Sequence, residues 1–222
     1  KIDDGLSEAE GFAFMEKIAD QNGYLSLDSY LGAGAYSHHI PAIVGAITSR
    51  SEFMTAYTPY QAEASQGLLQ VLFEYQTAIC RLTGMDAANA SVYDGASACA
   101  EACLMAVRSA SSASPKIALS SGLHPLYRRV VEQYLIGNAI EIDTFGPDVQ
   151  ELKDDYAGVL VQSPNFFGSL ERLPKLNSGV KILCGNPLSY GLYTPPGDKG
   201  ADIAVGDLQP LGLPLSFGGP YA

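Results

Sequence analysis

The sequence predicts an α/β fold built on a mainly parallel sheet with helices on both faces. Short apolar runs rich in β-branched residues recur along the second half of the chain, and helical segments separate several of them. Polar residues follow directly after most of these runs, as expected where the carboxyl ends of parallel strands line a ligand crevice. At 222 residues the chain is long enough to form one large domain of this class.

Five strands are expected, at residues 116–120, 139–142, 158–162, 180–184 and 202–205. A helix at 125–135, closed by Gly137, fits between the first two strands, and a shorter helix is expected at 148–153. Right-handed crossovers between such units give a parallel sheet.

Two helices are expected in the first half of the chain. Residues 7–22 have an amphipathic pattern, with the apolar stripe Phe12, Phe14, Met15 and Ile18. A longer helix is expected from about Pro59 to Thr83, because Thr58 and Gln61 have capping-box spacing around Pro59. Its apolar stripe consists of Leu68, Leu72, Tyr75, Ile79 and Leu82, and Gly84 ends it.

Another helix is expected after Asp94, which is a suitable N-cap, and it runs to about Ser109. Gly95, Ala96 and Ser97 are small enough for a ligand to approach the backbone at this helix N-terminus. Such helix ends bind phosphate through free N–H groups and the helix dipole. The pattern is common before helices and does not by itself identify a phosphate site.

Composition limits the function classes. The chain carries a net charge of −11 with 13 scattered Lys and Arg, which argues against nucleic acid or an anionic membrane as a partner. No run of 18 apolar residues is present, and no signal peptide is recognised, although the chain begins at Lys1 rather than Met. The four cysteines are expected to be buried free thiols of a cytoplasmic protein rather than metal ligands.

Two loops are candidate sites. His38 and His39 lie between glycines and a proline, where a role in a site and a purely structural role are both open. The segment after residue 205 is rich in Gly and Pro yet nearly free of charge, which indicates backbone packed against a ligand or a partner. Gln209 stands at the start of this segment.

Several ordered motifs resemble one family. TAYTPYQAEASQG at 55–67 and QPLGLPLSFGGP at 209–220 are similar to signatures of the glycine cleavage system P-protein, and further matches lie at 75–77, 82–86, 88–91, 93–95, 164–168 and 195–197. The resemblance is to subunit 1 of the two-subunit form and implies a fold-type I pyridoxal-phosphate large domain. With an N-terminal arm at about 1–60, one such domain is expected over 1–222. The family's small C-terminal domain is expected to be absent, and 172–180 is expected to lack a crossover helix.

The family decarboxylates glycine through pyridoxal phosphate and passes the aminomethyl group to a lipoyl H-protein. The resemblance implies three parts: a Schiff-base lysine, an acid beside the pyridine nitrogen, and a phosphate cradle. Gln209 aligns with the lysine and Asn186 with the acid, and neither side chain can replace its counterpart. Only the cradle at 94–97 matches the family, and the nearby Lys199 is expected to be solvated. The cofactor is therefore expected on the partner subunit.

The resemblance thus predicts a subunit of glycine dehydrogenase that is inactive alone and assembles as a heterotetramer with a homologous catalytic subunit. The residues expected to complete the partner's site are Tyr36, His38, Tyr57, Thr58, Tyr60 and Gln61. The tyrosines could instead only pack and cap the long helix. Two other functions remain open: a scaffold that does not touch the chemistry, and an independent pyridoxal-phosphate lyase or aminotransferase. No metal site is expected.

Overall fold

The computed structural model describes residues 5–28, 30, 36, 38–54, 58–110 and 115–216. The chain divides into two compact units, Lys1–Tyr36 and Ser37–Ala222. The α/β fold lies in the second unit.

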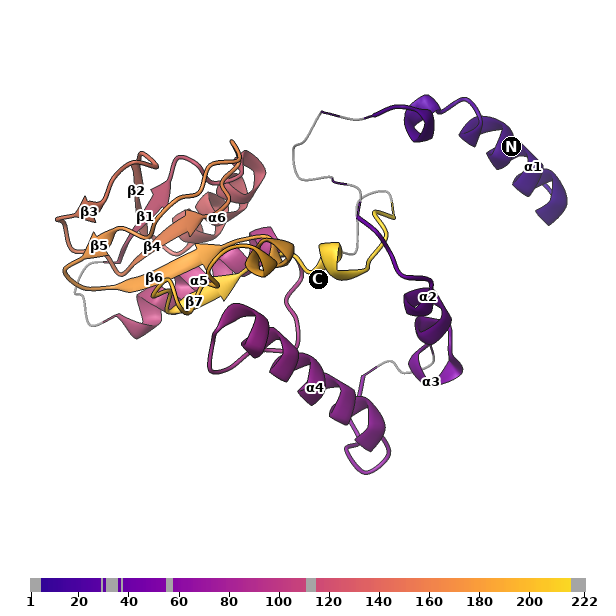
Figure 1. Cartoon of the computed structure of the whole chain (residues 1–222), viewed down its shortest axis with the longest axis horizontal. Coiled ribbons are helices and arrows are strands. Elements are labelled where there is room, and N and C mark those ends of the chain that lie inside the picture. Colours follow the sequence, from indigo (N-terminus) through magenta and orange to yellow (C-terminus); the bar gives the residue numbers. More distant parts are fainter. Residues whose placement is uncertain are drawn as a thin grey trace. The chain divides into compact units, whose positions relative to one another are not determined.

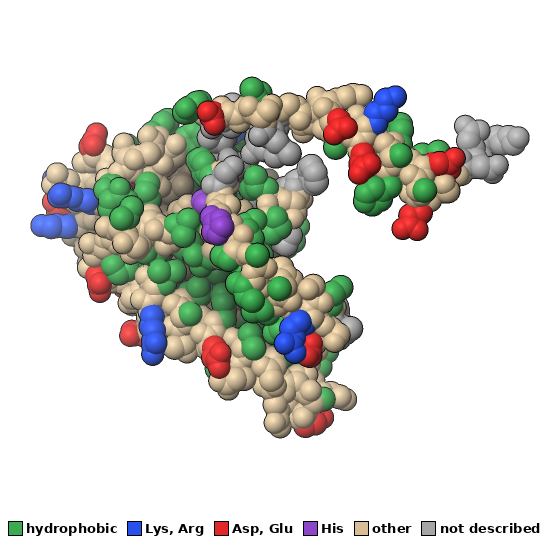
Figure 2. Space-filling model, turned by 45° about the vertical axis from the view of Figure 1, so that its right-hand side comes forward, with side chains coloured by type: hydrophobic (Ala, Val, Ile, Leu, Met, Phe, Trp, Pro, Cys, Tyr) green, Lys and Arg blue, Asp and Glu red, His purple; other side chains and the backbone are tan. Residues whose placement is uncertain are grey.

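The first unit contains helix α1 (Glu8–Ala19) and the short 3₁₀ helix η1 (Gly23–Ser26). A capping box starts α1: the N–H of Glu10 donates to Ser7 Oγ, and the N–H of Ser7 donates to Glu10 Oε2 at 2.9 Å. The amphipathic helix expected at 7–22 is confirmed, with a shorter C-terminal end. None of its residues is buried, and its hydrophobic side chains stand on the surface beside acidic ones (Figure 2).

The second unit is built on a five-stranded parallel sheet with the strand order β2-β1-β4-β6-β7 (Figure 1). Its strands are β1 (Lys116–Ser120), β2 (Glu141–Phe145), β4 (Gly158–Gln162), β6 (Val180–Cys184) and β7 (Ile203–Val205). A separate parallel pair is formed by β3 (Glu151–Leu152) and β5 (Lys175–Leu176). Its helices are α2 (Ala42–Thr48), α3 (Ser51–Met54), α4 (Gln66–Thr83), α5 (Gly95–Ser109), α6 (Pro125–Gly137), η2 (Pro187–Gly191) and η3 (Gln209–Leu211).

The two faces of the sheet are covered differently. On one face, Ile117, Leu119 and Leu160 pack with α5 and α6 in the larger apolar cluster. On the other face, Val159 and Val161 pack against residues of the β3–β5 segments. The predicted parallel α/β class is confirmed, but helices on both faces are not seen in the described residues. Among the described residues, the connections from β2 to β4 and from β4 to β6 contain only the short strands β3 and β5, and their apolar residues pack on this second face.

The predicted start of α4 is wrong. The helix begins at Gln66, because residues 61–64 form turns in which the N–H of Ala64 donates to the Gln61 carbonyl three residues back. The capping-box spacing of Thr58 and Gln61 is a local signal that these turns override. The predicted end is correct: Gly84 takes a left-handed conformation with φ of 72° and closes the helix.

Two other elements differ from the prediction. The strand expected at 139–142 begins at Glu141, since Ala139 has a positive φ of 55° in the turn after α6, and it extends to Phe145 by pairing with β1. The short helix expected at 148–153 is wrong, because Glu151 and Leu152 pair with β5 as strand β3. A six-residue window is too short to separate a helical from a strand period. In the part of the chain that the structure describes, none of the helices has the length and apolar character needed to cross a bilayer.

An ion pair at the β1–β2 edge gives a pH-dependent prediction. Lys116 Nζ pairs with Asp143, which also accepts a hydrogen bond from the Tyr156 hydroxyl at 2.9 Å. The Lys116 ammonium lowers the pKa of Asp143, so the folded chain holds this proton less tightly than the unfolded chain. The stabilisation is complete above the usual Asp pKa of about 4 and is lost as the pH falls through the lowered value.

Asp143→Asn is therefore expected to lower Tm by about 2 °C at pH 7, since ion pairs that remain partly in contact with solvent contribute little, and by less below pH 4. Calorimetry of both proteins from pH 3 to 7 measures the difference. A difference that grows on acidification would contradict this assignment.

Candidate functional site

The carboxyl edge of the sheet has a topological switch point between β1 and β4, because the chain leaves β1 toward β2 on one side and returns as β4 on the other. Open α/β sheets bind ligands in the crevice at such a point. The loops after these two strands carry Ser120, Gly122, His124 and Asn165, as the sequence predicted for this edge. The N–H of His124 donates to Gln162 Oε1 at 2.7 Å and joins the two loops.

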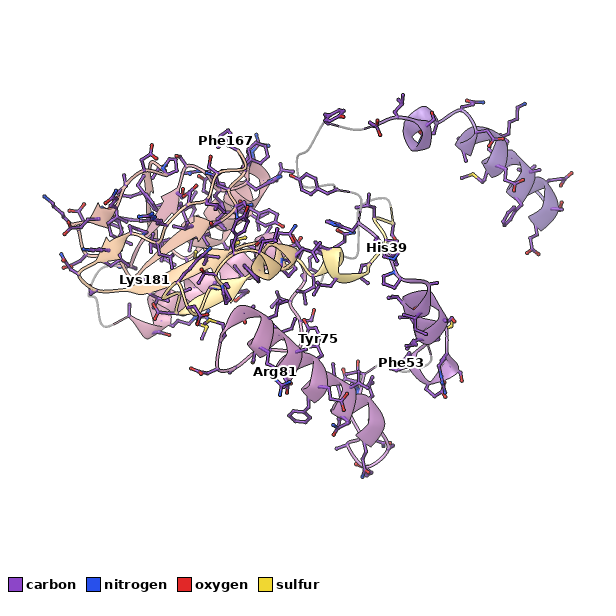
Figure 3. The ribbon with its side chains drawn as sticks, in the orientation of Figure 1. His39, Phe53, Tyr75, Arg81, Phe167 and Lys181 are labelled. Carbon is purple, nitrogen blue, oxygen red and sulfur yellow. The ribbon has the colours of Figure 1, made fainter. Side chains whose placement is uncertain are left out.

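Glu171 fills the region between these loops. Glu171 is 5% exposed, and its carboxyl group accepts hydrogen bonds from Ser120 Oγ at 2.6 Å and from Asn165 Nδ2 at 2.7 Å. Asn165 Oδ1 in turn accepts from the N–H groups of Phe167 and Ser169, and Figure 3 marks Phe167 in this loop. A buried carboxyl group with its donors in place fixes the loop after β4.

The second part of the edge is the N-terminus of α5, the expected phosphate cradle. Asp94 is the N-cap, as predicted, and its Oδ1 accepts from the N–H of Ser97 at 2.7 Å. The N–H of Gly95 donates to Asp207 Oδ1 at 2.7 Å, and Asp207 follows β7 at the opposite end of the sequence. These two N–H groups, which would face a phosphate, are therefore bound to carboxylates of the chain itself.

Asp207 is held from a second direction by α6, because the Tyr127 hydroxyl donates to Asp207 Oδ2. The pKa of Asp207 is raised above its usual value, mainly because the carboxyl group is partly buried. The hydrogen bond from the N–H of Gly95 opposes this rise, the nearby Asp94 adds to it, and His124 opposes it. The pKa of the buried Cys99 thiol is raised by its hydrogen bond with Cys184 and by burial. The charge of Asp207 adds a smaller contribution. The carboxyl group thus lies in a partly desolvated position at a helix N-terminus.

The two positions aligned with the lysine and the acid are also engaged locally. Gln209 is 5% exposed, and its Nε2 donates to the Leu213 carbonyl at 2.7 Å. Asn186 Oδ1 accepts from the N–H of Leu188 at 3.0 Å and starts η2. Lys199 is half-buried rather than solvated, and burial lowers its pKa. It precedes β7 and so lies toward the amino edge of the sheet, whereas Gln209 follows the carboxyl edge.

The residues expected to face a partner lie in the first unit and in the segments before α2 and before α4. Thr58, Tyr60 and Gln61 are exposed in the segment before α4, and Tyr60 is 81% exposed. Nε2 of His38 is buried and has no hydrogen-bond partner among the described residues. Tyr36 is exposed and belongs to the first unit, and Tyr57 lies outside the described residues.

A groove of about 1390 Å³ runs between α4 and α5, and its lining extends along α5 as far as Arg108. Tyr75 and Ile79 of the predicted apolar stripe line it from α4, and Figure 3 marks Tyr75 and Arg81 on this helix. Tyr93, which precedes the N-cap and is 86% exposed, lines it from the other side. No residue of α4 is buried. Three residues of its apolar stripe, Tyr75, Ile79 and Leu82, border this open groove.

Sequence reasoning did not assign roles to Asp207, Tyr127 and Glu171. A charged residue two positions after the apolar strand β7 was a usable signal for Asp207. No sequence signal pairs Tyr127 with Asp207, which stand 80 residues apart, or Ser120 with Glu171, which stand 51 apart.

The described residues do not fit the pyridoxal phosphate that the resemblance implies. Gln209, which the resemblance aligns with the lysine, is a carboxamide bound to its own loop, and Asn186, which it aligns with the acid, is a neutral helix cap. The N–H group of Gly95, where the phosphate would bind, already donates a hydrogen bond to the carboxylate of Asp207. A second anion at this helix end would be repelled by Asp207.

Comparison with known proteins identifies relatives along the whole chain. The family profile described as "Glycine cleavage system P-protein" matches residues 1–222. A "Probable glycine dehydrogenase (decarboxylating) subunit 1" of Protochlamydia amoebophila (strain UWE25) is 56% identical over 238 residues, which cover 100% of this chain and 53% of the relative. The chain spans about half the length of the curated relatives that it matches.

Solved structures agree with this assignment. The crystal structure of a glycine decarboxylase (P-protein) of the glycine cleavage system, in inhibitor-bound form, matches with a TM-score of 0.87 and 41% identity over 99% of this chain and 52% of that one. A variant of the lyase C-DES with glycine covalently linked to its PLP cofactor matches 82% of this chain and 52% of its own at a TM-score of 0.51 and 14% identity, which shows a shared fold alone. The chain belongs to the glycine cleavage system P-protein family.

Proposed function

We propose that this chain acts as a subunit of a glycine dehydrogenase (decarboxylating), that a homologous partner subunit holds the pyridoxal phosphate, and that this chain completes the partner's active site. In the proposed reaction glycine is decarboxylated on the partner's cofactor, and the aminomethyl group passes to a lipoyl H-protein. When bound, the cofactor would accept the electrons released as carbon dioxide leaves.

One observation carries this proposal: the three places that a cofactor would need are all engaged by the chain's own hydrogen bonds. Gln209 is bound to Leu213, Asn186 to Leu188, and the N–H of Gly95 to Asp207. A chain of this family whose described residues leave no place for the cofactor needs another subunit for the chemistry. The relatives' printed name, "subunit 1", supports the existence of such a partner.

The exposed segment before α4 supports the proposal that this chain reaches into the partner's site. Thr58, Tyr60 and Gln61 place two hydroxyls and a carboxamide on the surface, where they are accessible to a partner. Such groups can position a carboxylate substrate and exclude water without forming covalent bonds to it. His38, with its buried and unpaired Nε2 among the described residues, is a further candidate.

The test is co-expression of this chain with its homologous partner, followed by measurement of glycine–bicarbonate carboxyl exchange in the presence of H-protein. Tyr60→Phe is expected to leave the complex intact and to reduce exchange by about tenfold or more, because a positioning hydrogen bond is lost. Tyr193→Phe, which changes a tyrosine outside the proposed site, serves as the matched control and is expected to keep the full rate.

The scaffold function makes a different prediction in the same experiment. If the partner alone shows full exchange, or if Tyr60→Phe and Gln61→Ala both keep the full rate in the complex, this chain holds the partner without contributing to the chemistry. An exchange rate that requires this chain and falls on substitution at Tyr60 supports the proposal.

A further inference from the structure

We infer that Asp207 is an internal substitute for a bound phosphate: its carboxylate occupies the N-terminus of α5 and closes that helix end to external anions. The inference concerns this chain's own helix end. It holds whether or not the chain completes a partner's site, so the two proposals fail in different experiments.

Carboxylates of the chain already occupy the N-terminus of α5. The first free N–H group of α5, that of Gly95, donates to Asp207 Oδ1 at 2.7 Å, and the N–H of Ser97 donates to the N-cap Asp94 at 2.7 Å. Helix N-termini attract anions through these N–H groups and the positive end of the dipole. Here both attractions act on carboxylates that belong to the chain.

The space beside Gly95 is filled by Asp207 and Tyr127. A Cβ atom at this position would lie 2.5 Å from Asp207 Oδ2 and 2.6 Å from the Tyr127 hydroxyl oxygen. Glycine at a helix N-terminus usually allows a ligand to approach the backbone closely. In this chain the close approach is made by Asp207 and Tyr127, and no room for a phosphate group is left at Gly95.

The three residues that meet at this helix end come from three different elements. Asp207 follows β7, Tyr127 lies in the first turn of α6, and Gly95 is the first residue of α5. The carboxylate therefore joins three elements that are distant in sequence, as a bound phosphate would join them through its several oxygens. This accounts for the burial of a charged side chain at a cost in solvation.

The experiment measures Tm of the full chain in chloride and in inorganic phosphate at equal ionic strength. The variant is Asp207→Ala, and the matched control is Asp148→Ala, which removes an equal charge from an exposed turn. In chloride, Asp207→Ala is expected to lower Tm by about 5 °C, and Asp148→Ala by no more than about 1 °C. Phosphate at about 20 mM is expected to raise Tm of Asp207→Ala alone, because only that variant exposes the helix end.

Two results would overturn the inference. Phosphate or pyridoxal phosphate that stabilises the wild-type chain as much as Asp207→Ala would mean that the helix end is open. An Asp207→Ala chain that is destabilised but does not respond to phosphate would mean that the position has no affinity for a free anion.

A second variant keeps the test decisive if Asp207→Ala does not fold. Asp207→Asn preserves the shape and the acceptor atom but removes the charge. In the wild-type chain the amide resonance of Gly95 is expected to shift as the Asp207 carboxyl titrates, and Asp207→Asn should remove most of that shift. Asp94, His124, Tyr127 and Cys99 also face this carboxyl group, so a pH-dependent shift that persists unchanged in Asp207→Asn would assign the effect to them and contradict the inference.

Discussion

Replacing Gly206 with alanine is expected to lower the free energy of unfolding by at least about 3 kcal/mol. A Cβ atom at Gly206 would overlap the carbonyl oxygen of Gly185, which is backbone and cannot rotate away. Gly185 is itself tied to β7, because its N–H donates to the Val205 carbonyl at 3.0 Å. The added methyl group can be accommodated only if the ends of β6 and β7 separate.

Urea unfolding of the full chain measures this effect, and Gly137→Ala is the matched control. Gly137 ends α6, and a methyl group added there would meet no heavy atom within 4 Å, so alanine is expected to leave stability unchanged or to raise it by no more than about 1 kcal/mol. Since Gly206 directly precedes Asp207, the Gly206→Ala substitution should also displace the carboxylate from α5. A Gly206→Ala chain as stable as the wild type would contradict the close packing of this edge.

Glu171→Ala is the second substitution with a large expected effect, about 3 kcal/mol of destabilisation. It leaves Ser120 Oγ and Asn165 Nδ2 without their acceptor in a buried region. A polar group that stays buried without a partner destabilises the folded state by its full desolvation penalty. The loop after β4, which depends on Asn165 for its turn, should become more mobile.

Calorimetry and hydrogen exchange of the amides at 165–169 measure these consequences. Glu101→Ala on α5 removes an exposed carboxylate and is expected to change stability by less than about 0.5 kcal/mol. Glu171→Gln should fall between the two, because an isosteric amide keeps one acceptor. A Glu171→Ala chain that retains wild-type stability and protection would show that the network does not hold this loop.

The strands that pack on both faces were predictable from sequence. Residues 116–120, 158–162 and 180–184 are nearly continuous apolar runs, and each forms a strand with the predicted limits. Asp94 was a reliable N-cap signal, because a cap depends only on residues within one turn. The same local kind of signal failed at Thr58 and Gln61, where turns among the following residues delay the start of α4.

The contacts that decide the site were not predictable, because they join residues that are distant in sequence. Asp207 meets Gly95 across 112 residues. The alignment of Gln209 and Asn186 indicated which groups a cofactor would lack, but not that both side chains would bind their own loops. The roles assigned to Tyr36, His38, Tyr57, Thr58, Tyr60 and Gln61 remain predictions, since they depend on a partner subunit.

Reductive trapping distinguishes whether this chain or its partner subunit holds the cofactor. The complex with the homologous partner is treated with borohydride, which fixes pyridoxal phosphate to the lysine that binds it, and mass spectrometry then locates the label. We expect the label on the partner subunit only. Stoichiometric label on a lysine of this chain, Lys199 included, would contradict the proposal that the partner holds the cofactor.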